Sequence, residues 1–160
     1  LKTNDLQNWA IPTPLICYFF IIPYREEEQN PLTFYHDYRS ESKIYRAATQ
    51  GIYGKQVNRN GETYVCAEVP VSDSASAIWG NPEKYTDDIW MEMLEVGVVS
   101  GKFNSVLVKK APQSIKIFRT GYSQKLAEFK SRVSSISGRI ELPKTDWDSH
   151  RGIMESAKYE

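Results

Sequence analysis

The run at residues 15–24 constrains the fold more than any other stretch of the chain. It reads LICYFFIIPY, and its β-branched and aromatic side chains favour a strand over a helix. Nearly every position is apolar, so we expect a strand that is buried on both faces or packed under another element. Pro23 cannot donate a ladder hydrogen bond, so the strand ends near this residue or lies at a sheet edge.

Further strand-like segments follow, separated by turn residues. Asn60 and Gly61 favour a tight type I′ hairpin, because both residue types tolerate positive φ. This hairpin joins a segment ending near Val57 to a strand starting near Thr63. In that second strand, alternation places Tyr64, Cys66 and Glu68 on one face and Val65, Ala67 and Val69 on the other. Other strands are expected at 32–38, 43–57, 105–109, 114–119 and 138–142.

Two segments fit more than one kind of element. Residues 89–96 fit a strand, while Tyr85, Ile89 and Met93 stand at helical spacing, which makes a helix over 82–94 the alternative. Residues 124–136 fit a last strand or a short helix. The whole pattern predicts a mainly β protein of the α+β class, with an antiparallel, strongly curved sheet or barrel and few short helices. We expect an N-terminal arm at 1–13, a single β domain at 14–142 and a polar tail at 143–160.

Charge and composition argue against several classes of function. The formal net charge is zero, which gives no attraction to nucleic acid or to an anionic membrane. The longest apolar run is too short to span a bilayer and does not resemble a signal peptide, so we expect a cytoplasmic protein. Cys17 and Cys66 fall in apolar runs and are expected to be buried free thiols. His36 and His150 show no ligand spacing, so neither a metal nor another cofactor is predicted.

The turn at 79–84 (WGNPEK) carries the strongest candidate chemistry. A lysine held beside Trp79 at the end of a buried strand loses hydration, which lowers its pKa and frees the amine of Lys84 to act as a nucleophile. The alternative is a solvated loop lysine that caps a helix or pairs with an acid. Glu68 is a second candidate, because a glutamate among apolar neighbours lies either at a rim or inside a polar-lined cavity.

The order of these segments resembles the acetoacetate decarboxylase family over residues 18–142. The pieces that carry the resemblance are 18–25, 31–32, Tyr45, 60–61, 64–65, 79–84, 99–103 and 116–117. The most specific is Trp-Gly-x-Pro-x-Lys, which resembles the family's Trp-Gly-Phe-Pro-Lys-Lys. The resemblance implies a cone-like β structure around an apolar cavity, in which a lysine forms a Schiff base with a β-keto acid.

The resemblance also implies roles for particular residues. Glu83 stands where the family has its nucleophilic lysine, Lys84 matches the second lysine, Ala47 replaces an assisting glutamate and Arg25 is kept. We therefore expect a divergent decarboxylase-like lyase acting on a small keto or carboxylic metabolite. Its expected catalytic residues are Lys84, Glu83 and Glu68, and its expected substrate-binding residues are Arg25, Trp79 and Tyr64. The alternatives are a non-catalytic small-molecule binding protein of the same fold and a structural subunit of a larger assembly. A homo-oligomer is compatible with each.

Overall fold

The computed structural model describes residues 9–24, 34–49, 58–72 and 75–136. The chain divides into two compact units, one formed by Leu1–Ala10 with Phe118–Glu160 and the other by Ile11–Ile117. Among the described residues, no helix combines the length and the apolar character needed to cross a membrane.

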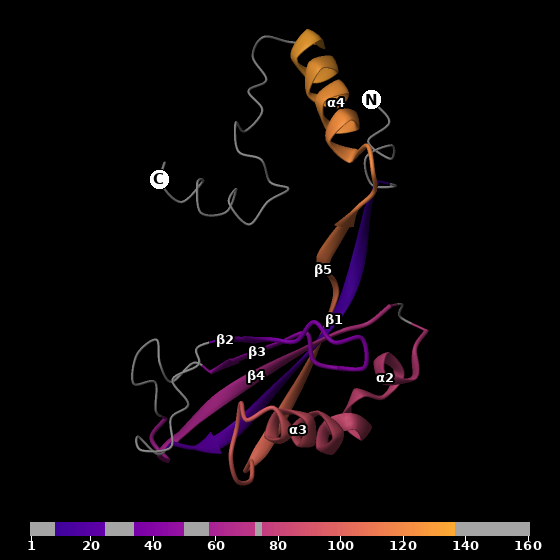
Figure 1. The fold of residues 1–160 in the computed structure, drawn as a ribbon. Helices are drawn as coiled ribbons and strands as arrows, with labels where there is room; N and C mark the ends of the chain where they lie inside the picture. The colour runs from indigo at the N-terminus through magenta and orange to yellow at the C-terminus, as the bar shows by residue number, and fades with distance from the viewer. Residues whose placement is uncertain (1–8, 25–33, 50–57, 73–74, 137–160) are drawn as a thin grey trace. The chain divides into compact units, whose positions relative to one another are not determined.

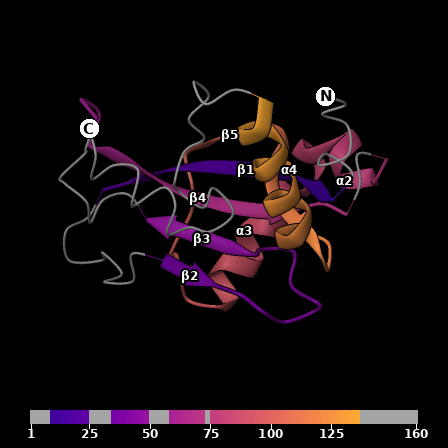
Figure 2. The same ribbon diagram turned by 90° about the horizontal axis from the view of Figure 1, so that it is seen from above.

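A five-stranded sheet dominates the second unit (Figure 1). Its strands are β1 (Ala10–Pro23), β2 (Phe34–His36), β3 (Arg46–Thr49), β4 (Glu62–Pro70) and β5 (Ser105–Phe118). The strand order is β2-β3-β4-β1-β5, which can be followed across the sheet in Figure 2. β1 pairs with β4, β4 with β3 and β3 with β2, and all three pairings are antiparallel. The apolar run at 15–24, expected to form a buried strand that ends near Pro23 or lies at an edge, forms most of the inner strand β1, which ends at Pro23.

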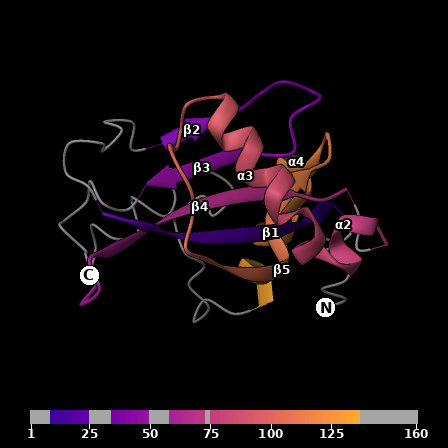
Figure 3. The same cartoon turned by 90° about the horizontal axis from the view of Figure 1, so that it is seen from below.

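Helices cover one face of this sheet. They are α2 (Ala77–Gly80), the 3-10 turn η3 (Pro82–Tyr85) and α3 (Thr86–Glu95), which lie in front of the strands in Figure 3. α3 contributes Ile89, Trp90 and Met93 to the core, each at most 5% exposed. The ring of Trp90 lies 5.0 Å from that of Phe20 on β1. Full burial of side chains of this size stabilises a fold by roughly 1.5–3 kcal/mol each, so α3 contributes substantially to the apolar core that it shares with β1 and β4.

The structure confirms the coarse expectation of a mainly antiparallel, curved sheet with few short helices. The described strands form an open sheet, and they do not show the predicted closed barrel or the cavity inside it. Aromatic and aliphatic side chains fill the space between the sheet and α3. The strand expected at 89–96 is wrong, because most of it belongs to the helical alternative, α3. The two strands expected at 105–109 and 114–119 are one continuous strand, β5.

The Asn-Gly turn is present but is not of type I′. Gly61 has φ +72, whereas no other residue type has positive φ in the described chain, so Asn60 does not meet the type I′ requirement. Instead the side-chain carbonyl of Asn58 accepts hydrogen bonds from the N–H groups of Asn60 and Glu62, both at 2.9 Å. The segment before this turn, up to Val57, lies outside the described residues, as does the strand expected at 138–142.

The described part of the first unit is a helix beside a tryptophan. α4 (Tyr122–Ile136) settles the ambiguous segment at 124–136 in favour of a helix. The N–H of Arg119 donates to the carbonyl of Trp9 at 2.9 Å. Gly121 has φ +91, and a Cβ atom there would lie 3.2 Å from the Trp9 ring, so this corner needs glycine for both conformation and space.

Candidate functional site

The sheet of the second unit has two faces with different surroundings. One face carries Tyr18, Phe20 and Val65 and packs against the core side of α3. Side chains alternate along a strand, so the neighbouring positions point to the other face. We call this the open face, because the described helices of the unit lie on the opposite side (Figure 3). Its residues are Cys17, Phe19 and Ile21 of β1, Phe34 and His36 of β2, Arg46 and Ala48 of β3, and Tyr64, Cys66 and Glu68 of β4.

An arginine and a glutamate form the polar centre of the open face. Arg46 and Glu68 lie directly opposite each other on β3 and β4, and the Arg46 Nη2 group donates to the Glu68 carboxylate. The Glu68 side chain is 14% exposed and that of Arg46 is 37% exposed. The hydrogen bond that Arg46 donates to Glu68 raises the pKa of Arg46, so the guanidinium remains charged. The guanidinium carbon also lies 5.8 Å from the centre of the Phe34 ring.

The Arg46 guanidinium keeps unused hydrogen-bonding capacity. Its Nε atom is buried and has no hydrogen-bond partner within the described part of the chain. A buried donor without a partner costs free energy that a bound acceptor recovers. Arg46 is therefore held in place by Glu68 and Phe34, while its buried Nε donor lacks a partner among the described residues.

Two cysteine thiols lie next to this polar centre. Cys17 on β1 stands opposite Glu68, and Cys66 on β4 stands opposite Phe19, so the two cysteines are diagonal neighbours on one face. Both are free thiols, as expected from the sequence; Cys66 is buried, whereas Cys17 is only half-buried. A side-chain hydrogen bond from Cys66 lowers the pKa of Cys17, and the same hydrogen bond together with burial raises the pKa of Cys66.

Aromatic side chains flank the polar centre. The rings of Phe19 and Tyr64 meet edge to face, with centroids 5.9 Å apart. His36, Tyr38 and Tyr45 form a second cluster, in which the His36 ring stacks on Tyr38 at 6.1 Å and meets Tyr45 edge to face at 5.7 Å. Rings around a fixed charge are the groups that orient an organic ligand carrying both a planar part and a charge.

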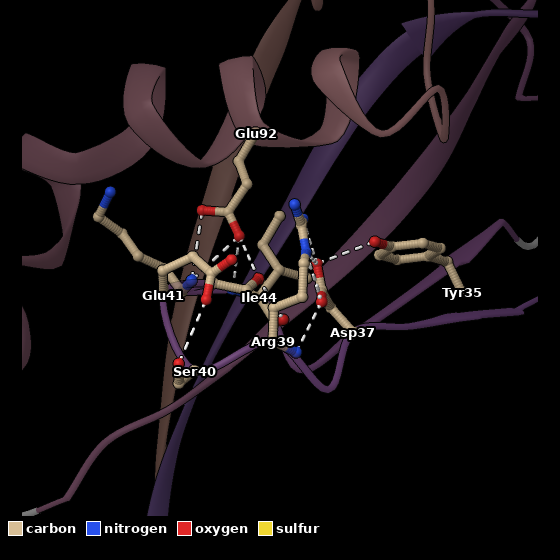
Figure 4. A network of polar contacts seen from close by, with 9 residues as sticks. Tyr35, Asp37, Arg39, Ser40, Glu41, Ile44 and Glu92 are labelled. Atoms are coloured by element: carbon tan, nitrogen blue, oxygen red, sulfur yellow. Dashed lines mark hydrogen bonds and ion pairs between the residues drawn. The ribbon is translucent and has the colours of Figure 1, made fainter.

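A hollow of about 380 Å³ lies between the loop before β3 and α3. Arg39, Lys43 and Glu92 are among the residues that line it. Figure 4 shows Glu92 reaching from α3 to this loop. Its carboxylate accepts hydrogen bonds from the N–H groups of Lys43 at 3.0 Å and Ile44 at 3.1 Å, and from the Ser42 hydroxyl. Because these contacts occupy the Glu92 carboxylate, we assign this hollow a structural role and take the open face as the candidate site.

Two of the six site residues expected from the sequence lie on the open face. Glu68 is half-buried and pairs with Arg46, and Tyr64 is half-buried beside Phe19. The alternation of β4 placed both on one face, and the register confirms this. Arg25 lies outside the described residues.

The other three expected residues lie on the helical side of the sheet. Trp79 in α2 is half-buried against the core, and the ammonium of Lys110 lies 5.5 Å from its ring. Glu83 and Lys84 are exposed in η3. The structure therefore does not bring these three residues together with Glu68 and Tyr64, and their individual roles stay predictions.

Sequence reasoning missed Arg46 and left the two thiols as core cysteines. Cys66 and Glu68 were correctly placed on one face of β4, but the alternation within one strand does not say which strands are its neighbours. Arg46 and Cys17 join the site only through the pairings of β3 and β1 with β4. Among the described residues, no group of three or more His, Cys, Asp or Glu side chains is placed so that it could hold a metal ion.

Comparison with known proteins corrects the family expectation. No family model matches the chain, and no curated protein matches it in sequence. Among solved structures, part of a reduced UDP-galactopyranose mutase matches with a TM-score of 0.62 and 13% identity, covering 82% of this chain and 28% of the mutase. Part of a protoporphyrinogen oxidase from Exiguobacterium matches with a TM-score of 0.57 and 10% identity, covering 80% of this chain and 28% of the oxidase.

The likeness at these identities is one of fold. The chain spans about a quarter of the length of both matched proteins. The fold is thus shared with parts of a mutase and an oxidase, and the expected resemblance to acetoacetate decarboxylase is wrong. The expectation of a decarboxylase-like lyase that uses Lys84, with Glu83 and Ala47 at the family's catalytic positions, is withdrawn with it.

Proposed function

We propose that this chain supplies the ligand-facing β-sheet of a larger redox enzyme, with the open face turned toward the ligand. The observation that carries the proposal is the fold shared over most of the chain with parts of an oxidase and of a mutase described in its reduced form. A protein that is described as reduced carries a redox-active group. The chain corresponds to about a quarter of each matched protein. In this proposal, further domains or a partner protein supply the other parts of the enzyme, including the rest of the ligand site.

The open face supports a particular class of ligand, an organic anion that contains rings. A guanidinium binds carboxylate or phosphate oxygens through paired N–H groups, and Arg46 keeps an unpartnered Nε donor. Phe34 and Tyr64 supply ring surfaces close to that charge. The substrate named for the mutase, a uridine diphosphate sugar, combines rings with phosphates, and protoporphyrinogen combines rings with carboxylates.

A flavin is the form of redox group that we favour, because flavins are common organic cofactors for oxidation and reduction. The 160 residues contain no Gly-x-Gly-x-x-Gly sequence of the kind that holds a dinucleotide phosphate at a helix N-terminus. The nucleotide part of such a cofactor therefore does not fit this chain and belongs, in this proposal, to additional protein. The open face then binds and orients the substrate and excludes water from it. The cavity expected from the sequence is completed between the open face and that additional protein.

The proposal is tested by calorimetric binding of two probes, uridine diphosphate and protoporphyrin, to the 160-residue chain. Arg46→Ala is expected to weaken binding of both probes about tenfold or more, because hydrogen bonds to charged groups contribute about 1.5–3 kcal/mol. Arg46→Lys retains the charge without the planar fork. Its affinity for each probe is therefore expected to lie between that of the wild type and that of Arg46→Ala. Lys84→Ala, an exposed cation on the other side of the sheet, is the matched control and binds as the wild type. Failure of both probes to bind, or equal loss in the Lys84 variant, contradicts the proposal.

A further inference from the structure

The polar centre of the open face carries a cation and an anion side by side. Arg46 and Glu68 stand directly opposite each other on β3 and β4, and the guanidinium donates to the carboxylate. Of the open-face residues named above, these two are the ones with a formal charge at pH 7. Their formal charges cancel, so the pair presents a neutral centre to a ligand.

The burial of Glu68 makes its charge felt by any anion that reaches Arg46. The Glu68 side chain is 14% exposed and that of Arg46 is 37% exposed, so solvent screens the carboxylate less than the guanidinium. The Nε donor of Arg46 is buried and has no partner among the described residues. An anion bound there is attracted by the guanidinium and repelled by the carboxylate that the same guanidinium holds.

The balance of these forces depends on the charge of the ligand. The cost of removing an ion from water grows with the square of its charge, whereas its attraction to a fixed cation grows only linearly. A second negative charge on the ligand also doubles the repulsion by Glu68. A carboxylate and a phosphodiester carry one negative charge, whereas a phosphate monoester carries nearly two at a pH of about 8, because its second pKa is about 6.

We propose that Glu68 is a specificity-determining residue, which restricts the anion subsite at Arg46 to singly charged oxyanions and disfavours phosphate monoesters. The inference rests on the proposed function, because it requires a ring-containing anion on the open face. It goes further by selecting among such anions: the group that contacts Arg46 is a carboxylate or a phosphodiester.

Calorimetric titration of the 160-residue chain with three uridine ligands at a pH of about 8 tests the proposal. They are uridine monophosphate, its methyl ester, and a uridine carboxylic acid that has a carboxylate in place of the phosphate. All three share the same rings, and only the monophosphate is doubly charged. The wild type is expected to bind both singly charged ligands several-fold more tightly than the monophosphate. The tighter of these two ligands identifies the preferred group as phosphodiester or carboxylate.

A charge-removing variant isolates the role of Glu68. Glu68→Gln keeps the size of the side chain and an acceptor for Arg46. It is expected to raise the affinity for the monophosphate about tenfold and for the methyl ester about threefold, because Coulomb energy scales with ligand charge. Glu83→Gln, an exposed position in η3, changes the net charge equally and is the matched control, with affinities equal to those of the wild type.

The ratio of the affinities for the methyl ester and the monophosphate decides the result, because a general loss of structure weakens both ligands alike. Equal or tighter binding of the monophosphate by the wild type overturns the proposal, and so does a ratio that is the same in wild type and Glu68→Gln. Failure of all three ligands to bind a chain that binds uridine diphosphate or protoporphyrin also overturns it, while the proposed function stands. Failure of those two probes as well contradicts the proposed function itself.

Discussion

Asp37 illustrates how a single residue orders the loop that follows β2. Its side chain is only 3% exposed, and its carboxylate accepts hydrogen bonds from the Tyr35 hydroxyl at 2.8 Å and from the Arg39 N–H at 3.0 Å. The Arg39 guanidinium adds a contact of 2.6 Å. Hydrogen bonds from Arg39 hold the pKa of Asp37 well below its ordinary value. The ionised form of Asp37 is therefore the form that fits the fold.

This pKa shift predicts a specific loss of stability in acid. The unfolded pKa of an aspartate is about 3.9, so the stabilisation is present above that pH and is lost as pH falls through the lower folded pKa. Asp37→Asn should lower the free energy of unfolding at neutral pH, and its difference from wild type should narrow in acid. Urea denaturation over a series of pH values measures this. Glu41→Gln, an exposed acid in the same loop, is the control, and a gap for Asp37→Asn that is independent of pH would be the contrary result.

Tyr18 contributes stability that is lost at high pH, whereas the contribution of Asp37 is lost in acid. Burial, and then the nearby Glu83 and Tyr85, raise its pKa to about 12, and its hydroxyl donates to the Pro82 carbonyl at 2.8 Å. The stabilisation by neutral Tyr18 is complete below the unfolded pKa of about 10 and is lost as pH rises toward the folded pKa. Tyr18→Phe should lower the free energy of unfolding by about 1 kcal/mol at neutral pH. It should also remove one high-pH step from the phenolate absorbance titration, and an unchanged titration argues against the buried hydrogen bond.

The sequence predicts which face of a strand a side chain lies on, but it does not predict which residue of a neighbouring strand the side chain contacts. Alternation correctly placed Tyr64, Cys66 and Glu68 together, because the side chains of a strand alternate regardless of what pairs with it. Arg46 was not recognised, because the segment at 43–57 has no clear period and the Arg46–Glu68 contact depends on the register of β3 with β4.

At the scale of elements, α3 shows why a short apolar run is ambiguous. The sequence from Ile89 onward supplies apolar side chains at both strand and helix spacing. The structure buries Ile89, Trp90 and Met93 and exposes Met91, which is a helical pattern of burial. Asp87 and Asp88 in the first turn also favour a helix start, because acidic side chains complement the N-terminal end of the helix dipole.

α3 is also an anchor for the loop before β3, and this leads to a prediction. Glu92→Ala removes the acceptor of the Lys43 and Ile44 N–H groups, and Ile44 is only 1% exposed. Loss of the acceptor of the part-buried Ile44 N–H is expected to cost about 1–3 kcal/mol of the free energy of unfolding. Thermal and urea unfolding measure the change. Glu95→Ala, an exposed position on the same helix, should leave stability within about 0.5 kcal/mol of wild type, and equal effects of both variants would refute the anchor.

At the scale of the whole molecule, the strand order determines which residues meet. β1 lies between β4 and β5, although β5 is the last strand of the sheet in the chain, so long-range pairing builds the centre of the sheet. A short motif does not specify such pairing. The Trp-Gly-x-Pro-x-Lys sequence that suggested acetoacetate decarboxylase forms α2 and η3, a local corner on the helical side. The fold matches cover 82% and 80% of this chain, far more than this corner, so the motif is a poor guide to the fold.

The central claim is that the open face of the sheet, and not the corner at Glu83 and Lys84, meets the ligand. Titration of the 160-residue chain with uridine diphosphate, followed by backbone amide chemical shifts, tests it most directly. The account predicts that the shifts concentrate on β3 and β4 around Arg46, Cys66 and Glu68. Shifts centred on Glu83 and Lys84, or a spectrum that does not change, would contradict it.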